Sequence, residues 1–273
     1  MKPDTAMPAA VRSGHHRGTA FTVHGAGAPI VLIHGVGMAR RIWAPQIPAL
    51  AAQHQVIVYD LLGHGESDLP PEHAGLADYA AQLAQLLDHL DVRAATIVGH
   101  SMGALIALEF ALQYPARTIK VAALNAVYAR TPEQRRSVMQ RADDLVQTGV
   151  GATLESTIAR WFGDPVPPAL QENAALTRAL LAAVNQTGYA RTYRLFASQD
   201  EAHVERLPRL AAPALFMTGE CDTNSSPAMS RAMAEATPGA ALVVIPGERH
   251  MMCLTAPELV NHQLLRFIGA PAL

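Results

Sequence analysis

The sequence contains few residues of several kinds, and each scarcity excludes a class of protein. Its two cysteines, Cys221 and Cys253, are too few for a disulfide framework among 273 residues. We expect free thiols, as is usual in a cytoplasmic chain, with a bridge between the two as the alternative. Charged residues make up 16% of the chain and hydrophobic residues 50%, a balance that favours a globular protein over a disordered one.

Net charge is also small, because 21 basic residues nearly balance 23 acidic ones and leave −2. A nucleic-acid-binding protein usually has a basic surplus on one face, so we expect no nucleic-acid partner. No apolar run approaches the roughly 20 residues that span a bilayer, and the N-terminal segment lacks the apolar stretch of a secretory signal. We therefore predict a cytoplasmic protein with no membrane partner, whose residues 1–17 form a loose leader.

Motifs for metal ions and nucleotides are missing as well. The chain has no H-E-x-x-H segment or similarly spaced ligand set, and the His15-His16 pair is interpreted as part of a solvated tail. The turn Gly35-Val36-Gly37 lacks the third glycine and the acidic partner of a dinucleotide-binding loop. We therefore expect no cofactor and a small-molecule substrate as the partner, while a monomer and a homodimer both stay open.

What the sequence does contain is a repeated succession of a short apolar run, a glycine-rich turn and a helical stretch. The runs are continuous rather than alternating, which is typical of strands buried on both faces of a parallel sheet. Such strands are predicted at residues 30–33, 56–59, 95–98, 121–124, 214–217 and 241–245, with a further strand or hairpin at 18–24. Helices are predicted at residues 76–90, 102–114, 227–236 and 257–268. This alternation favours a doubly wound α/β fold.

One long segment interrupts the alternation. From residue 128 to residue 206 the sequence has helical patterns without strand patterns, broken at Gly149, Gly151 and a proline-rich turn over residues 163–168. An insertion of this length between two strands predicts a helical cap at 128–206 over a core formed by residues 1–127 and 207–273.

The segment from Gly99 to Gly103, with Ser101 at its centre, predicts a catalytic nucleophile. It directly follows an apolar strand and opens a helix, which is the context that a G-x-S-x-G pattern requires. A sharp strand-to-helix turn strains the serine backbone, and glycines on either side let the chain pass close to its neighbours. The N–H groups at a helix N-terminus also favour a developing negative charge. The alternative is a serine that only caps the helix.

Two further residues would complete a triad with Ser101. A serine hydroxyl needs a base to remove its proton, and His250 is placed for this role in the loop after the last apolar run. Asp222 follows the preceding run and would orient the imidazole and stabilise its charged form. Glu220 is the nearest rival for the acid, and the alternative for Asp222 is a helix-capping role.

An acyl-transfer site also needs donors for the oxyanion. The backbone N–H of Met102, directly after the nucleophile, is the first candidate, and the N–H of Val36 in the turn after the first long apolar run is the second. His34 in the same turn could brace it through its ring, and a purely structural role is the alternative.

Together these motifs resemble the α/β-hydrolase superfamily across residues 20–268. The resemblance rests on His34-Gly-x-Gly37, Asp60-x-x-Gly-His-Gly-x-Ser67, Gly99-x-Ser-x-Gly103, Gly219-x-x-Asp222 and Gly247-x-x-His250. It implies an eight-stranded, mostly parallel sheet with the helical cap inserted after the sixth strand. Within the superfamily the chain looks most like small bacterial carboxylesterases, enol-lactonases and carbon–carbon bond hydrolases, and Gly188-Tyr189-Ala190 is similar to a segment of enol-lactonase-like members.

We therefore predict a serine hydrolase that cleaves a small carboxylic ester or lactone through an acyl-enzyme. A hydrolase of carbon–carbon or amide-type bonds in a catabolic carboxylic acid is the alternative with the same triad. A low-turnover ligand-binding sensor on the same fold is the alternative from another class.

Specificity is expected to reside in the cap. Candidates for an apolar pocket are Trp161, Phe162, Tyr189, Tyr193 and Phe196, and Met251 is expected to pack beside the site. Candidates for a clamp on a substrate carboxylate are Arg130, Arg191 and Arg194, against the alternative that each is a surface residue. An arginine facing Ser101 would favour a carboxylate-bearing substrate over a neutral ester.

Overall fold

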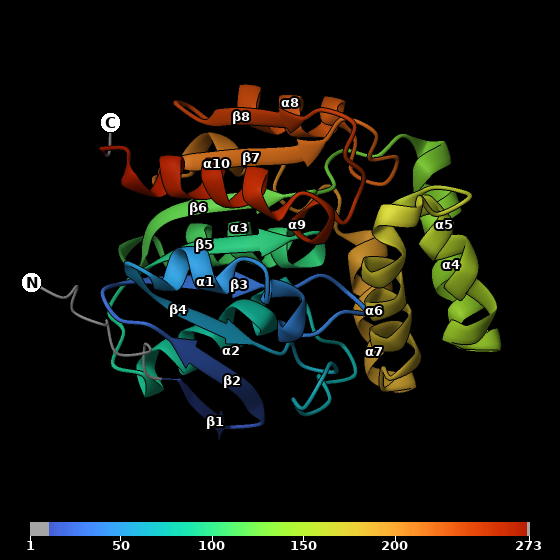
Figure 1. Ribbon diagram of the computed structural model, residues 1–273, viewed down its shortest axis with the longest axis horizontal. Helices are drawn as coiled ribbons and strands as arrows, with labels where there is room; N and C mark the ends of the chain where they lie inside the picture. Colours follow the sequence, from blue (N-terminus) through green and yellow to red (C-terminus); the bar gives the residue numbers. More distant parts are fainter. Residues whose placement is uncertain (1–10, 272–273) are drawn as a thin grey trace, which may run out of the picture.

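The computed structural model describes residues 11–271 and has an eight-stranded sheet at its centre (Figure 1). The strands are β1 (Arg12–His16), β2 (Thr19–His24), β3 (Ala28–Ile33), β4 (His54–Tyr59), β5 (Ala95–His100), β6 (Thr118–Leu124), β7 (Ala214–Gly219) and β8 (Ala241–Ile245). Their order across the sheet is β1-β2-β4-β3-β5-β6-β7-β8. β1 and β2 pair antiparallel, and the pairs from β4 to β8 are parallel, which confirms the predicted α/β fold class.

The continuous apolar runs form the interior strands, as their pattern predicted. All residues of β5 and β7 are buried, because helices cover both faces of a parallel sheet. β8 is an edge strand, and only its last residue, Ile245, is fully buried. The apolar runs therefore predicted the interior strands correctly, and they also predicted the edge strand β8.

The N-terminal segment corrects the expectation of a leader over residues 1–17. Residues 12–16 form β1, which pairs with β2 in a hairpin, while residues 1–10 lie outside the described part of the chain. Arg17 and Gly18 connect the strands and both have positive φ, of 44° and 74°, which is the geometry of a tight primed hairpin turn. β1 is an exposed edge strand that needs no apolar run, so its polar sequence gave no strand signal.

The core helices are α1 (Ile47–Ala51), α2 (Leu76–His89), α3 (Met102–Gln113), α8 (Pro227–Ala236), α9 (Met252–Thr255) and α10 (Pro257–Gly269). α2 and α3 pack against each other, α3 lies against β5 and β6, and α10 crosses the front of the sheet in Figure 1. The four longer helices match the predicted ones to within one residue at each end, whereas the short α1 and α9 were not predicted. Among residues 11–271, no helix combines the length and apolar character needed to cross a membrane.

Four further helices lie between β6 and β7, in the segment where the cap is predicted. They are α4 (Pro132–Thr148), α5 (Leu154–Phe162), α6 (Gln171–Ala182) and α7 (Gln186–Ser198). α4 packs on α7 and α5 packs on α6, and the group covers the carboxyl ends of the parallel strands (Figure 1). Asp200 ties the two ends of the segment together, because it accepts from the Arg130 N–H and from the Arg135 guanidinium.

Candidate active site

Ser101 occupies a strained turn between β5 and α3. Its φ and ψ are 56° and −116°, a conformation that residues with a side chain rarely adopt. A methyl group on Gly99 would collide with the carbonyl of Gly103, and one on Gly103 would collide with the carbonyl of Ile33. Both glycines of the pentapeptide are therefore needed for close backbone contact, and together they place Ser101 at the N-terminus of α3.

His250 lies in the loop after β8 and contacts Asp222 from the loop after β7. Its Nδ1 is 2.8 Å from Oδ2 of Asp222, and both side chains are buried. Asp222 Oδ1 accepts from the N–H groups of Asn224 and Ser225 at 2.8 and 3.1 Å. Burial disfavours the Asp222 carboxylate, but the adjacent His250 and the hydrogen bonds outweigh it and hold its pKa below the ordinary value.

Asn125 is a residue of this cluster that the sequence analysis did not single out. It follows β6, has a φ of 51°, and its Nδ2 donates to Asp222 Oδ2 at 2.8 Å. A polar residue directly after a buried strand was visible in the sequence, but its partner was not. Glu220, the rival acid, accepts instead from the Gly247 N–H and lies on the surface. The structure therefore pairs the histidine with Asp222.

The turn after β3 lies directly against Ser101. A Cβ on Gly35 would be 3.1 Å from the Cβ of Ser101, so Val36 is brought next to the serine. Met102 opens α3, where the first N–H groups of a helix have no partner within the helix. In the part of the chain that the structure describes, neither the Val36 nor the Met102 N–H donates to another protein group. Both are thus available to a ligand beside Ser101.

Two buried histidines brace this turn against the loop after β4. His34 Nε2 accepts from the Leu61 N–H at 3.0 Å, and His64 Nε2 accepts from the Gly37 N–H at 2.9 Å. An imidazole accepts at one nitrogen only when it is neutral. Burial and the neighbouring His34 lower the pKa of His64 to about 3, and burial also lowers the pKa of His34. Both rings are therefore neutral braces near pH 7, which is the bracing role considered for His34.

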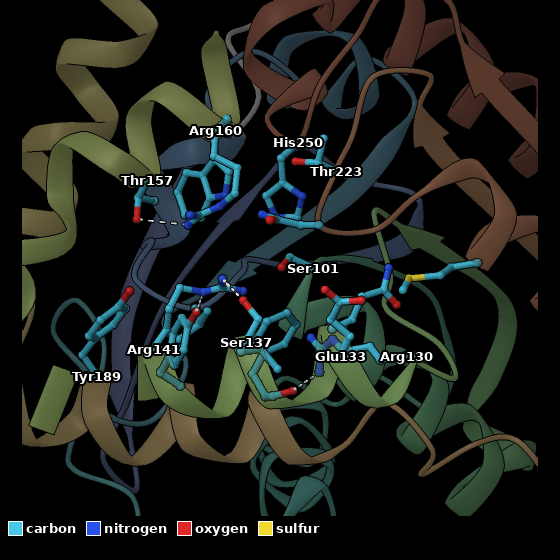
Figure 2. Close-up of a pocket in the computed structure, with 18 residues that line it drawn as sticks. Ser101, Arg130, Glu133, Ser137, Arg141, Thr157, Arg160, Tyr189, Thr223 and His250 are labelled. Atoms are coloured by element: carbon cyan, nitrogen blue, oxygen red, sulfur yellow. Dashed lines mark hydrogen bonds between the residues drawn. The ribbon is translucent and has the colours of Figure 1, made fainter. Parts of the chain in front are cut away.

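A pocket of about 320 Å³ opens above Ser101, between the carboxyl ends of the strands and the cap (Figure 2). Ser101, His250 and Val36 line it from the core. The cap side chains that line it include the predicted Trp161, Tyr189, Tyr193 and Phe196. The Trp161 ring lies 5.3 Å from the His250 ring, so the cap covers the histidine with an apolar surface.

Other predicted binding residues lie elsewhere, and these expectations are corrected. Arg191 donates to the Pro70 carbonyl at 2.8 Å, Arg194 pairs with Asp143, and neither lines the pocket. On α7 the pocket face carries residues 189, 193 and 196, so positions 191 and 194 point away from it. Phe162 is buried in the hydrophobic core rather than in the pocket wall. Met251, directly after His250, is also buried in the core and does not itself line the pocket.

Arg130 does line the pocket, but Asp200 and the carbonyls of Phe196 and Ala197 already bind its guanidinium. Two arginines that the sequence analysis missed, Arg141 and Arg160, also line the pocket. These two arginines belong to no sequence motif. Only the packing of α4 and α5 shows which face of each helix lines the cavity. Cys221 and Cys253 are free thiols, as expected.

A family model described as alpha/beta hydrolase fold matches residues 28–257. The chain belongs to the α/β-hydrolase fold family. It is 36% identical over 251 residues to (E)-2-((N-methylformamido)methylene)succinate hydrolase of Acinetobacter baylyi, covering 92% of this chain and 94% of that protein. It is 31% identical over 193 residues to 3-oxoadipate enol-lactonase 1 of the same organism, covering 71% of each. These relatives place the chain among hydrolases.

Solved structures agree with this assignment. A thermophilic esterase from Thermogutta terrifontis, solved with malate bound, superposes with a TM-score of 0.82 at 27% sequence identity. The match covers 95% of this chain and 98% of the esterase. The α/β-hydrolase core and the helical segment over it are therefore shared with a known hydrolase structure.

Proposed function

We propose that this protein is a serine hydrolase that cleaves a carboxylic ester or lactone bond of a small substrate through an acyl-enzyme. The observation that carries the proposal is the convergence of three chain segments on one pocket. Ser101 is held in a strained turn at a helix N-terminus, and His250, which contacts Asp222, lines the same cavity. This arrangement is the one that nucleophilic acyl transfer requires.

In the proposed mechanism, Ser101 Oγ attacks the substrate carbonyl while His250 Nε2 removes the hydroxyl proton. Nδ1 of the same ring faces Asp222, which fixes the tautomer and stabilises the imidazolium. The N–H groups of Val36 and Met102 would bind the tetrahedral oxyanion. His250 then protonates the leaving group, and a water molecule, deprotonated by the same histidine, releases the acid from Ser101.

The surroundings of the triad support this chemistry. His34 and His64 hold the turn that carries Val36 through bonds that a neutral imidazole makes, so the oxyanion donors are in place before substrate binds. Trp161 covers His250 from the cap and limits the access of water to the imidazole.

An amide-type bond is the second candidate, and one observation favours it. The 36% identical Acinetobacter hydrolase has a formamido group in the name of its substrate, whereas the enol-lactonase acts on a lactone. Ester, lactone and amide hydrolysis share the acyl-enzyme route, so a panel of matched esters, lactones and formamides would rank them by kcat/KM. Turnover of the formamides above that of the esters would replace the ester proposal with the amide one.

The test of the nucleophile is the Ser101→Ala variant. Loss of the hydroxyl removes the acyl-enzyme, so kcat for 4-nitrophenyl acetate should fall by at least about 10³-fold. A fluorophosphonate probe should label the native protein and fail to label the variant. Ser198→Ala, which changes an exposed serine of α7, serves as the matched control and should behave as the native protein.

Undiminished turnover by Ser101→Ala would contradict the proposal. A native protein that binds small acids but is neither labelled nor active would instead be a ligand-binding sensor.

A further inference from the structure

The pocket above Ser101 has an excess of positive charge that the hydrolytic steps do not use. Its charged lining residues are three arginines, Arg130, Arg141 and Arg160, and one glutamate, Glu133. The whole chain has a net charge of −2, so the cavity differs in sign from the molecule that contains it. Charge concentrated in a cleft of low dielectric selects the ligand that enters it.

Two of these arginines have no anionic partner among residues 11–271. Arg160 Nη2 donates to Thr157 Oγ1 at 3.2 Å, and Arg141 donates to Tyr193 Oη and Ser137 Oγ at 3.3 and 2.9 Å. All three acceptors are neutral. By contrast, carboxylates in the described chain pair with Arg40, Arg117, Arg130, Arg135, Arg178, Arg194 and Arg206.

Arg160 is the more constrained of the two. Its Nε is buried and has no hydrogen-bond partner within the described residues. Burial, followed by the like charge of Arg141, lowers the pKa of the Arg160 guanidinium. A desolvated cation with an unused donor, next to a second cation, is unfavourable unless an anion binds to it.

Glu133 does not fill this role. It lies in the exposed first turn of α4, where a negative charge complements the helix dipole, and it forms no ion pair with either arginine in the described structure. In the view of Figure 2, Arg160 lies above and Arg141 below on the same side of the cavity, and Ser101 lies to their right at an intermediate height. An anion held by the two arginines would therefore lie in the same cavity as the nucleophile.

We propose that Arg160 and Arg141 bind a free carboxylate of the substrate, separate from the carbonyl that Ser101 attacks. The substrate class is then a small acid whose scissile ester, lactone or amide bond lies a short carbon chain away from that carboxylate. A guanidinium binds a carboxylate through two parallel N–H donors, which fixes orientation as well as charge. Trp161, Tyr189 and Phe196 supply apolar walls for the carbon chain.

The identity of the cleaved bond in this proposal rests on the serine hydrolase function, but the carboxylate site does not. Two measurements distinguish a failure of the carboxylate site from a failure of the hydrolase function. One is the kinetic discrimination between an anionic and a neutral ester, and the other is carboxylate binding without turnover.

The kinetic test compares 4-nitrophenyl hemisuccinate with its neutral methyl ester. The native protein should have the higher kcat/KM for the hemisuccinate, and added salt should reduce that preference. Arg160→Gln should lower kcat/KM for the hemisuccinate by about 10- to 100-fold, as expected for charged hydrogen bonds, and change that for the methyl ester by less than about 3-fold. Arg141→Gln should have the same selective effect.

The control is Arg136→Gln, which removes a charge from the exposed face of α4 and should leave both substrates unaffected. Equal losses on both substrates in Arg160→Gln, or no loss on either, would overturn the carboxylate site.

The binding test uses Ser101→Ala, in which turnover is removed. Glutarate should bind in calorimetry, and the added Arg160→Gln change should abolish that binding. Inorganic phosphate is the second ligand, and phosphate binding as tight as that of glutarate would overturn a site specific for carboxylates. If glutarate binds through Arg160 but a fluorophosphonate probe fails to label the native protein, the carboxylate site stands and the hydrolase proposal falls. If the probe labels and esters are cleaved without charge preference, only the carboxylate site falls.

Discussion

Asn125 shows how one residue positions another in the candidate triad. Its N–H donates to the Met217 carbonyl at 2.8 Å, which fixes its backbone in the left-handed region with a φ of 51°. Its side chain then reaches Asp222 Oδ2, the same oxygen that contacts His250. Asparagine is among the few non-glycine residues that adopt this conformation readily, so backbone and side chain both restrict the choice at this position.

Replacing Asn125 with alanine should weaken the candidate triad without removing any of its three members. Asp222 would lose one buried donor, so the orientation of His250 would be less restricted. We expect kcat/KM for an ester to fall by about 10-fold, far less than in Ser101→Ala, and the free energy of unfolding to fall by about 1–3 kcal/mol. Steady-state kinetics and urea unfolding measure the two effects.

The matched control is Asn261→Ala. Asn261 lies on α10, and its side-chain amide donates to the Pro45 carbonyl at 3.1 Å, so the variant removes a comparable amide outside the candidate site. It should lower stability and leave kcat/KM unchanged. Equal activity losses in both variants would mean that Asn125 acts only through stability.

Single residues also show why part of the site was predictable. Ser101 and Asp222 each follow a buried strand, and His250 follows the apolar edge strand β8. Parallel strands end at the same edge of a sheet, so the order of the strands predicted that these three residues share one edge. Arg160 and Arg141 lie on amphipathic cap helices, where the sequence does not say which polar face meets solvent and which meets a cavity. Arg191 was chosen from the wrong face of α7 for this reason.

At the scale of elements, the cap approaches the core through two glycines. A Cβ on Gly188 of α7 would lie within 2.5 Å of the Gly63 Cα in the loop after β4. The next residue, Tyr189, lines the pocket, and its ring contacts the position where a Cβ on Gly37 would be, at 2.7 Å. The glycine in the Gly188-Tyr189-Ala190 segment therefore has a physical reason, because it allows α7 to approach the core closely above the turn that carries Val36.

Gly188→Ala should displace α7 from the core. The added methyl meets backbone rather than a flexible side chain, so the helix has to shift and carry Tyr189 with it. We expect a loss of about 1–3 kcal/mol in stability from overpacking, with a raised KM. Gly151→Ala is the control, because nothing lies within 4 Å of a Cβ there. A Gly188→Ala enzyme with native KM and stability would show that the contact does not set the cap position.

Elements differed in how well their sequences predicted them. β5 and β7 were found because burial on both faces requires continuous apolar residues. β1 was missed because an edge strand is held by backbone bonds to β2 and a turn at Arg17 and Gly18, neither of which requires apolar side chains. The fold class was therefore predictable from the interior strands of the sheet, whereas the missed strand, β1, lies at its edge.

For the whole molecule, buried histidines connect the loops that form the site. His34 and His64 join the turn after β3 to the loop after β4, and His100 Nε2 donates to the His250 carbonyl at 2.8 Å. Burial, followed by the charge of His250, lowers the pKa of His100 to about 3. The edge of the sheet that carries the candidate site is thus held by rings that stay neutral in the folded state.

Acid should therefore destabilise the whole fold before the carboxylates titrate. Between about pH 6.5 and pH 3 the unfolded chain binds a proton at His64 and at His100 while the folded chain does not, so stability falls as pH falls. Each histidine contributes a slope of up to about 1.4 kcal/mol per pH unit. Urea unfolding from pH 7 to pH 5 measures how the free energy of unfolding depends on pH. His100→Asn should reduce that slope by the contribution of one histidine. His262→Asn, at an exposed position of α10, should leave the slope unchanged; equal slopes in both variants would exclude His100 as an origin of the acid sensitivity.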